Sequence, residues 1–155
     1  MALEEPQPSV AREAWSCVFN LMTSEANRRR IGGICESFGV TPGQMRALAT
    51  MAPGPARPMK DLATAWHCDA SYVTVLVDDL EARGWVARQA HPDDRRLRVV
   101  LLTPSGEEVR RQLLDRLGEP PAFFAAISEA EQLAMRDILR KLLAAAGGPA
   151  GEGPG

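Results

Sequence analysis

The sequence predicts a mainly α-helical protein that carries one small β-hairpin. Three observations support this fold class. Apolar residues recur at helical spacing near both chain ends, two short helical segments follow one another in the middle of the chain, and an aliphatic stretch typical of strands comes directly after them. With 155 residues, of which 45% are hydrophobic, the chain is long enough for about one domain with a buried core.

The N-terminal part is expected to be helical after a short tail. Residues 1–8 contain two prolines and are predicted to be disordered. A helix is expected from Ser9, and its apolar residues recur at helical spacing: Trp15, Val18, Phe19 and Met22. The pattern breaks near residues 31–33, where two glycines occur. The three arginines at 28–30 are interpreted as a solvated helix end favoured by the helix dipole.

The next helix has a well-marked beginning. Thr41 can cap it, Pro42 suits its first position, and Gln44 completes a capping box. Its predicted buried stripe consists of Met45, Leu48 and Ala49. The proline- and glycine-rich segment 53–58 ends the helix, because prolines remove helical donors and favour extended backbone.

Two short helices joined by a tight turn come next. The first covers residues 59–66, and residues 67–68 form the turn. The second runs from Asp69, a good N-cap, to Arg83, and Gly84 closes it. Its apolar face should pack inward and consists of Val73, Leu76, Val77 and Leu80. The opposite face begins with Ser71, Tyr72 and Val75 and should point outward.

A hairpin follows the helix pair. Its strands are predicted at residues 85–90 and 97–103, and the His-Pro-Asp-Asp sequence at 91–94 is a turn signal. From Arg83 to Arg98 there are five arginines and two aspartates, a balance of +3, although the whole chain carries −2. Helix, turn, helix and basic hairpin, in this order, are suited to holding duplex DNA through both grooves.

The C-terminal part predicts two further helices. Thr103 and Pro104 begin the first, the prolines at 120–121 stop it, and Ser128 with Glu131 forms a capping box for the second. The second has a wide apolar stripe: Met135, Ile138, Leu139, Leu142 and Leu143. The Gly/Pro-rich residues 147–155 are predicted to be disordered.

These apolar stripes exceed what so small a core can cover, which favours burial against a second copy of the chain. We therefore predict a helical dimerisation region formed by residues 9–38 and 104–146, and a winged helix-turn-helix domain formed by residues 39–103. A dimer would present two copies of the helix 69–83 to DNA, one for each half of a palindromic site, and we call this helix the reading helix.

Composition narrows the function classes. Three widely spaced cysteines argue against a disulfide framework, and neither they nor the two histidines have metal-ligand spacing, so no metal and no cofactor are expected. No apolar run approaches the ~20 residues of a membrane span, and no secretory signal is recognisable, which predicts a cytoplasmic protein. No nucleophile, acid–base pair or cofactor loop indicates an enzyme.

Several motifs follow one another in a characteristic order. They are Gly39 to Met45, Asp61-Leu62-Ala63, Ser71-Tyr72-Val73-Thr74, the run from Val77 to Arg88, the wing Asp93-Asp94-Arg95-Arg96, and the exit Leu102 to Gly106. Together they resemble the MarR family of bacterial winged-helix transcriptional regulators. The resemblance extends over nearly the whole chain, from Trp15 to Leu143.

The resemblance implies a homodimer that binds a pseudo-palindromic operator, with the helix 69–83 in the major groove and the wing in the minor groove. It implies DNA contacts by Ser71, Tyr72, Thr74 and Val75, and by Arg95 and Arg96 on the wing. Asp94 would orient Arg96 through a salt bridge. Family members frequently carry a basic residue where this chain has Val75, and three acids follow on the same helix: Asp78, Asp79 and Glu81. Either binding depends more on the wing, or the operator preference is unusual.

The resemblance also implies a signal, and two kinds remain open. Many such proteins release DNA when a small aromatic or phenolic ligand binds, and the predicted pocket residues are Trp15, Met22, Met45 and Arg46. Others sense oxidation, and Cys17 lies roughly where those members carry their reactive cysteine. Those members surround the thiol with tyrosines, whereas this chain has only Tyr72, so a buried structural Cys17 is the favoured interpretation.

The leading hypothesis is a homodimeric repressor released by a small ligand. One alternative is a redox-responsive regulator of the same fold that uses Cys17. The other is a winged-helix module for protein interaction that has lost DNA binding.

Overall fold

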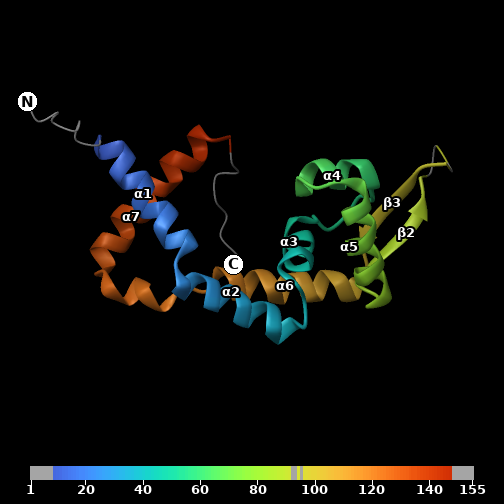
Figure 1. Cartoon of the computed structure of the whole chain (residues 1–155), viewed down its shortest axis with the longest axis horizontal. Coiled ribbons are helices and arrows are strands. Elements are labelled where there is room, and N and C mark those ends of the chain that lie inside the picture. Colours follow the sequence, from blue (N-terminus) through green and yellow to red (C-terminus); the bar gives the residue numbers. More distant parts are fainter. Residues whose placement is uncertain (1–8, 92–93, 95, 148–155) are drawn as a thin grey trace, which may run out of the picture.

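The computed structural model describes residues 9–91, 94 and 96–147. Figure 1 shows two parts joined by a pair of helices. We call residues 42–102 the head and residues 10–23 together with 122–145 the arm. The joining helices are α2 (Glu25–Phe38) and α6 (Pro104–Gly118), which run side by side between the two parts. The mainly helical prediction with a small wing is confirmed.

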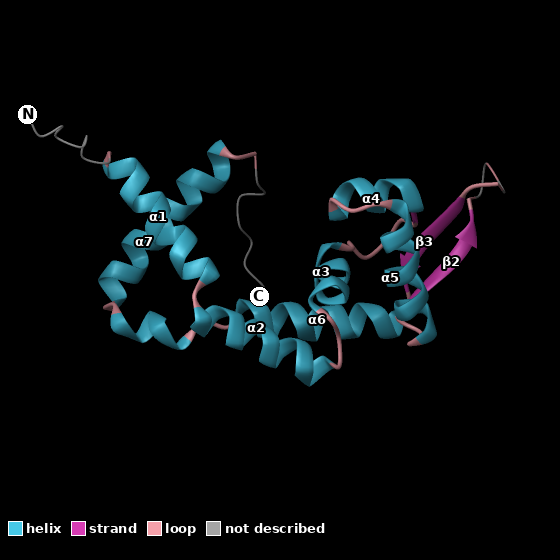
Figure 2. Cartoon of the chain, viewed as in Figure 1, coloured by secondary structure: helices cyan, strands magenta, loops and turns pink. Residues whose placement is uncertain are grey.

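The head contains three helices and a small sheet (Figure 2). The helices are α3 (Pro42–Thr50), α4 (Met59–Trp66) and α5 (Ala70–Ala82), and the strands are β1 (Arg57–Pro58), β2 (Val86–Ala90) and β3 (Arg98–Leu102). The sheet order is β1-β3-β2, with both pairings antiparallel. The predicted hairpin is β2–β3, whereas β1, which pairs with residues 99–100, comes from the proline-rich segment 53–58, for which extended backbone but no strand was expected.

Most of the core lies inside the head, and Ile34 of α2 and Leu113 of α6 complete it. The predicted inward face of α5 is confirmed, since Val73, Leu76, Val77 and Leu80 are all buried. Trp66, the last residue of α4, is also buried, and its indole N–H donates to the Thr50 hydroxyl at 2.9 Å. The indole nitrogen therefore has the partner that a buried polar group needs.

The start of α6 lies close against the start of the hairpin. The Thr103 hydroxyl donates to the Gly84 carbonyl at 2.6 Å and accepts from the backbone N–H of Gly106 at 3.0 Å, which caps α6. The backbone N–H of Thr103 donates to the Trp85 carbonyl at 3.0 Å. A Cβ atom on Gly106 would lie only 1.8 Å from that same carbonyl oxygen. Glycine is therefore required at this close approach of two backbones.

The arm has no core of its own. It consists of α1 (Val10–Thr23), a 3-10 helix η1 (Ala122–Ala126) and α7 (Glu129–Ala145), and no residue of these three elements is buried. Helices α1 and α7 cross at the end of the molecule away from the head (Figure 1). Large apolar side chains are left in contact with water, including Trp15 (65% exposed), Ile138 (57%) and Leu142 (59%).

The predicted helix break near residues 31–33 is wrong, because α2 continues through both glycines. The break lies at Ser24, whose hydroxyl accepts from the backbone N–H of Asn27 at 3.1 Å and so begins a new helix. Two glycines in a helix interior cost about 1 kcal/mol each relative to alanine without ending the helix. The arginine block therefore lies in the first half of α2 and not at a helix end. Arg28 and Arg29 are exposed, whereas Arg30 is half-buried.

The tails predicted for residues 1–8 and 147–155 fall outside the described residues, except for Gly147. None of the helices within the described ranges is both long and apolar enough to cross a membrane.

Candidate nucleic-acid interface

The outer face of α5 presents small polar groups and one valine. Asp69 caps the helix by accepting from the backbone N–H of Tyr72 at 2.8 Å. Ser71 and Thr74 are exposed, and the Thr74 hydroxyl donates to the Ala70 carbonyl at 3.0 Å. Its oxygen can still accept a hydrogen bond from a base. Val75 is 54% exposed and offers an apolar surface of the kind that contacts a thymine methyl.

Tyr72 belongs partly to this face and partly to the packing between α5 and α3. It is 41% exposed, and a Cβ on Gly43 would lie 2.3 Å from its hydroxyl oxygen. The hydroxyl therefore lies against the first turn of α3, and Gly43 leaves room for it. The Tyr72 hydroxyl therefore stays near the protein surface, but its contact with α3 limits the directions in which it can form a hydrogen bond to DNA.

The turn of the wing carries exposed charge. Asp94 and Arg96 are exposed, while Arg95 lies outside the described residues. The Asp94 carboxylate accepts a hydrogen bond from the backbone N–H of Arg96 at 2.9 Å. An aspartate two residues before a backbone donor commonly folds back in this way. The predicted salt bridge between Asp94 and the Arg96 guanidinium is not formed between these described side chains.

Arg88 neutralises two of the three acids on α5. Its guanidinium forms ion pairs with Asp78 at 2.5 Å and Glu81 at 2.7 Å, and its backbone N–H also donates to Glu81 at 3.0 Å. Burial by itself lowers the pKa of Arg88, but the hydrogen bonds and charges of Asp78 and Glu81 outweigh burial and raise that pKa above its ordinary value. The third acid, Asp79, accepts from the side-chain amide of Gln44 at 2.9 Å.

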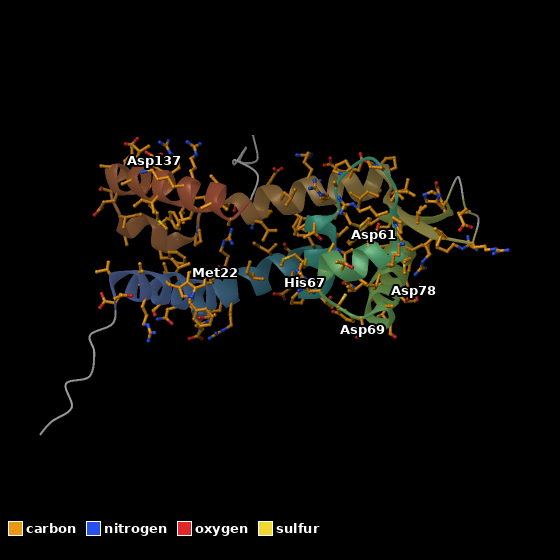
Figure 3. The ribbon with its side chains drawn as sticks, turned by 90° about the horizontal axis from the view of Figure 1, so that it is seen from above. Met22, Asp61, His67, Asp69, Asp78 and Asp137 are labelled. Atoms are coloured by element: carbon orange, nitrogen blue, oxygen red, sulfur yellow. The ribbon has the colours of Figure 1, made fainter. Side chains whose placement is uncertain are left out.

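The acidic end of α5 is thus largely balanced within the protein. The same contacts remove Arg88 from the positive charge counted on the wing. Arg83 is engaged as well, since it donates to the Gly39 carbonyl at 2.6 Å and lies over the Trp85 ring at 5.0 Å. In the described part of the segment 83–98, the exposed arginines other than Arg83 are Arg96 and Arg98. Figure 3 shows Asp69 and Asp78 on the head, far from Met22 and Asp137 on the arm.

Sequence reasoning missed the role of Arg88. Its partners precede it by seven and ten residues, on the other side of the turn at Gly84. Only the packing of β2 on α5 brings them together, so the sequence holds no periodic signal for this contact. A single basic residue on a predicted strand, directly after an acidic helix end, is the one available hint.

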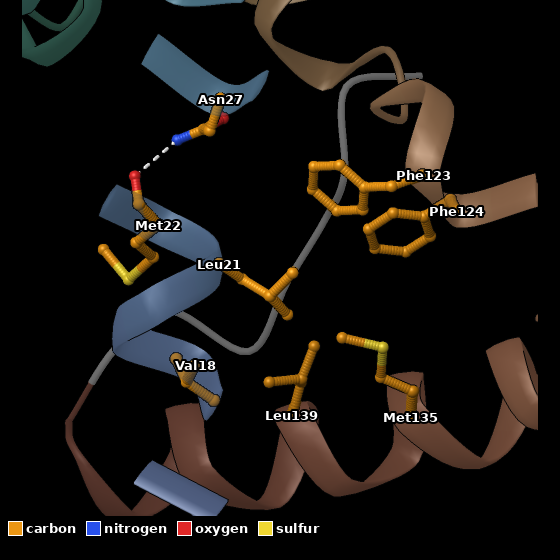
Figure 4. Close-up of a pocket in the computed structure, with 8 residues that line it drawn as sticks. All are labelled: Val18, Leu21, Met22, Asn27, Phe123, Phe124, Met135 and Leu139. Atoms are coloured by element: carbon orange, nitrogen blue, oxygen red, sulfur yellow. Dashed lines mark hydrogen bonds between the residues drawn. The ribbon is translucent and has the colours of Figure 1, made fainter. Parts of the chain in front are cut away.

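The predicted ligand pocket is not formed by the residues proposed for it. Trp15 and Met22 are exposed on α1 in the arm, whereas Met45 and Arg46 lie on α3 in the head. The break at Ser24 separates α1 from the head, which explains the difference. A cavity of about 210 Å³ does lie in the arm, between α1, η1 and α7 (Figure 4). It is lined by Val18, Leu21, Met22, Asn27, Phe123, Phe124, Met135 and Leu139.

The cysteines differ from expectation too. Cys17 is exposed on α1, so the prediction of a buried structural cysteine is wrong for a single chain without a partner. The buried cysteine is Cys35 on α2, whose Sγ lies 3.6 Å from the Met45 sulfur. Burial raises the pKa of the Cys35 thiol, and a backbone hydrogen bond opposes this effect only in part. No group of three potential metal ligands occurs in residues 9–91, 94 and 96–147.

Comparisons with known proteins agree with this geometry. A model of the MarR family matches residues 38–97. A protein of Thauera aromatica described as a transcriptional regulatory protein for the hcr operon is 30% identical over 110 residues, which are 70% of this chain and 66% of that protein. The transcriptional repressor MdtR of Bacillus subtilis is 30% identical over 112 residues, 72% of each chain.

A solved structure with a similar fold contains nucleic acid. A mutant of MepR from S. aureus, bound to an oligodeoxyribonucleotide, has a TM-score of 0.59 and 23% sequence identity. The match covers 85% of this chain and 97% of that one.

Proposed function

This chain belongs to the MarR family of transcriptional regulators, and from that premise we propose that it is a homodimeric, DNA-binding repressor. Each α5 enters a major groove and each wing contacts the adjacent minor groove. One observation carries the proposal. The exposed face of α5 with Ser71, Thr74 and Val75 stands beside a wing with an exposed Arg96, while the acids of α5 are paired within the protein.

The relatives support two parts of this proposal, repression and DNA binding. MdtR is named a repressor, and MepR has been solved with an oligodeoxyribonucleotide. We expect Ser71 and Thr74 to contact bases or phosphates, Tyr72 to contact phosphate, and Val75 to contact a thymine methyl. Arg96 should enter the minor groove, where a narrow A·T-rich segment concentrates negative potential. Arg95 is proposed for the same role from the sequence alone.

The exposed arm supports dimerisation. An isolated chain leaves the apolar faces of α1 and α7 in water, and contiguous apolar surface of this kind marks a protein–protein contact. A second copy is the occupant that fits, because two reading heads match a pseudo-palindromic operator. We therefore assign residues 9–38 and 104–146 to dimerisation and residues 39–103 to DNA binding.

Release by a small aromatic ligand completes the proposal. The cavity between α1, η1 and α7 is walled by Phe123, Phe124 and Met135, whose side chains suit an aromatic ring (Figure 4). At about 210 Å³ it is smaller than the ~300 Å³ at the lower end of drug-sized sites, so a single ring is the size that fits. The redox alternative depends on Cys17, which lies on α1 among residues that a second copy would cover.

Arg96→Ala tests the proposed DNA contact. The affinity for a duplex selected from a random library by the wild-type protein should fall by about tenfold, and the slope of log affinity against log salt should decrease by about two, because each of the two subunits loses one cation that displaces counterions from DNA. Fluorescence anisotropy titrations at several salt concentrations measure both. Arg136→Ala is the matched control, since Arg136 is an exposed arm arginine whose removal changes the net charge equally.

Equal behaviour of the two variants would exclude Arg96 from the interface. Absence of salt-dependent binding of the wild type to every duplex would favour the protein-interaction module instead.

Arg88→Gln tests whether Arg88 acts by neutralising α5 or by touching DNA. The variant leaves Asp78 and Glu81 unpaired near the duplex, so the affinity should fall by about tenfold. The triple variant Arg88→Gln/Asp78→Asn/Glu81→Gln removes the exposed charges and should restore wild-type affinity or exceed it. A triple variant as weak as Arg88→Gln would show that Arg88 itself contacts phosphate. The same anisotropy titration separates the two cases.

A further inference from the structure

The C-terminal end of α6 has two carbonyl groups that its own helix cannot satisfy. In a continuing helix the carbonyls of Arg116 and Leu117 would accept from the backbone N–H groups four residues later. Those positions are Pro120 and Pro121, and proline has no backbone N–H. The prolines that stop α6 therefore create a local need for donors from elsewhere.

Arg30 of α2 supplies these donors. One terminal nitrogen of its guanidinium donates to the carbonyl oxygens of Arg116 at 3.1 Å, Leu117 at 2.8 Å and Glu119 at 2.6 Å. A cation at a helix C-terminus also interacts favourably with the helix dipole. Arg30 is half-buried, whereas its neighbours Arg28 and Arg29 are exposed and contact residues of their own segment.

This contact lies where the arm joins the rest of the molecule. Helix α2 continues from α1, and the end of α6 leads through the two prolines to η1 and α7. Arg30 thus joins the two helices of the connection, α2 and α6, at one point. Farther along, the Gly39 carbonyl at the end of α2 accepts from Arg83 at the end of α5 at 2.6 Å. Helix α2 is consequently fixed to the arm side of α6 at one place and to the reading helix at another.

We propose that Arg30 is a positioning residue that fixes the angle between arm and head. In a dimer this angle sets the separation of the two α5 helices, and half-site spacing on DNA must match that separation. Arg30 then determines how strictly the protein discriminates between operators of different spacing, without touching DNA. This inference rests on the proposed dimeric DNA binding.

The experiment compares four proteins: wild type, Arg30→Met, Arg30→Lys and Arg29→Met. Each is titrated against a duplex that the wild type selects from a random library and against a single half-site. Each is also titrated against spacing variants of the selected duplex, in which the segment between the half-sites is one or two base pairs longer or shorter. Arg29→Met is the matched control on the same helix, with the same change of charge. Circular dichroism and sedimentation first establish that each variant is folded and has the wild-type oligomeric state.

We expect Arg30→Met to bind the selected duplex about tenfold more weakly and to distinguish the spacing variants much less, while its affinity for a single half-site is unchanged. Arg29→Met should keep the wild-type profile. Arg30→Lys should regain most of it, because one nitrogen makes all three contacts and an ammonium group has three donors. Arg30→Gln, whose amide is too short to reach α6, takes the place of Arg30→Met if the latter does not fold.

A loss of thermal stability with an unchanged spacing profile would reduce Arg30 to a helix cap and overturn the inference. Equal profiles for the Arg30→Met and Arg29→Met variants would also overturn it. A wild-type protein that binds a single half-site as tightly as the paired sites would instead contradict the proposed function, so the two failures are distinguishable.

Discussion

Replacing Ile138 and Leu142 by aspartate should convert the protein to a monomer and weaken its binding to a selected duplex by about 100-fold, because the second reading head no longer binds within the same complex. Both side chains are more than half exposed in a single chain, so the charges cost little in an isolated subunit. A dimer would bury two carboxylates from each copy without partners, which is strongly unfavourable. Analytical ultracentrifugation and anisotropy titration measure the two effects.

The control for this variant keeps the apolar character of both positions. Ile138→Leu combined with Leu142→Ile should leave the assembly and the affinity close to wild type, since apolar exchanges of equal volume are well tolerated. An aspartate variant that remains dimeric would place the interface elsewhere on the molecule. A wild-type protein that is already monomeric at the concentrations where it binds DNA would contradict dimerisation through α7 altogether.

Gly106→Ala should lower the free energy of unfolding by about 3 kcal/mol or more, at the upper end of the overpacking range. The new Cβ would lie 1.8 Å from the Trp85 carbonyl oxygen, which the backbone N–H of Thr103 already holds. Both sides of the contact are backbone, so neither can turn away as a flexible side chain would. Urea denaturation followed by circular dichroism measures the change.

Gly33→Ala provides the opposite expectation with the same chemical substitution. Gly33 lies inside α2, and nothing comes within 4 Å of the position of a Cβ. The variant should be more stable by about 0.5–1 kcal/mol, because alanine has the higher helix propensity. If Gly106→Ala and Gly33→Ala shifted stability in the same direction, the close approach of α6 to the hairpin would not exist in solution.

Elements with local signals could be predicted from the sequence. The capping box of Thr41 and Gln44 is present as expected, and so is that of Ser128 and Glu131. A capping box depends only on residues three positions apart, so the sequence contains all the information that it needs. The inward face of α5 was predictable for a similar reason, because one helix determines its own periodicity. The break at Ser24 was missed because the two glycines downstream gave a more conspicuous signal than a single capping serine.

Contacts across long stretches of chain could not be predicted. Arg30 lies 86 to 89 residues before its partners on α6, and no spacing rule connects them. Charge counting also failed locally, because Arg88 contributes to the positive balance in the sequence but neutralises α5 in the folded head. The proposed pocket combined residues of α1 and α3 because of the family resemblance, and no local signal shows whether these two helices face one another. Amphipathicity shows that a face is buried somewhere, and it does not show against what.

The three tryptophans occupy three different environments, which gives the protein built-in optical reporters. Trp66 is enclosed and hydrogen-bonded in the head, Trp15 is open to water on the arm, and Trp85 lies beneath a guanidinium group. If the proposed dimer covers Trp15, its emission should shift to longer wavelength on dilution, while Trp66 keeps its blue emission until the head itself melts. Subunit separation and melting are then resolved as two spectral events in a single unlabelled sample.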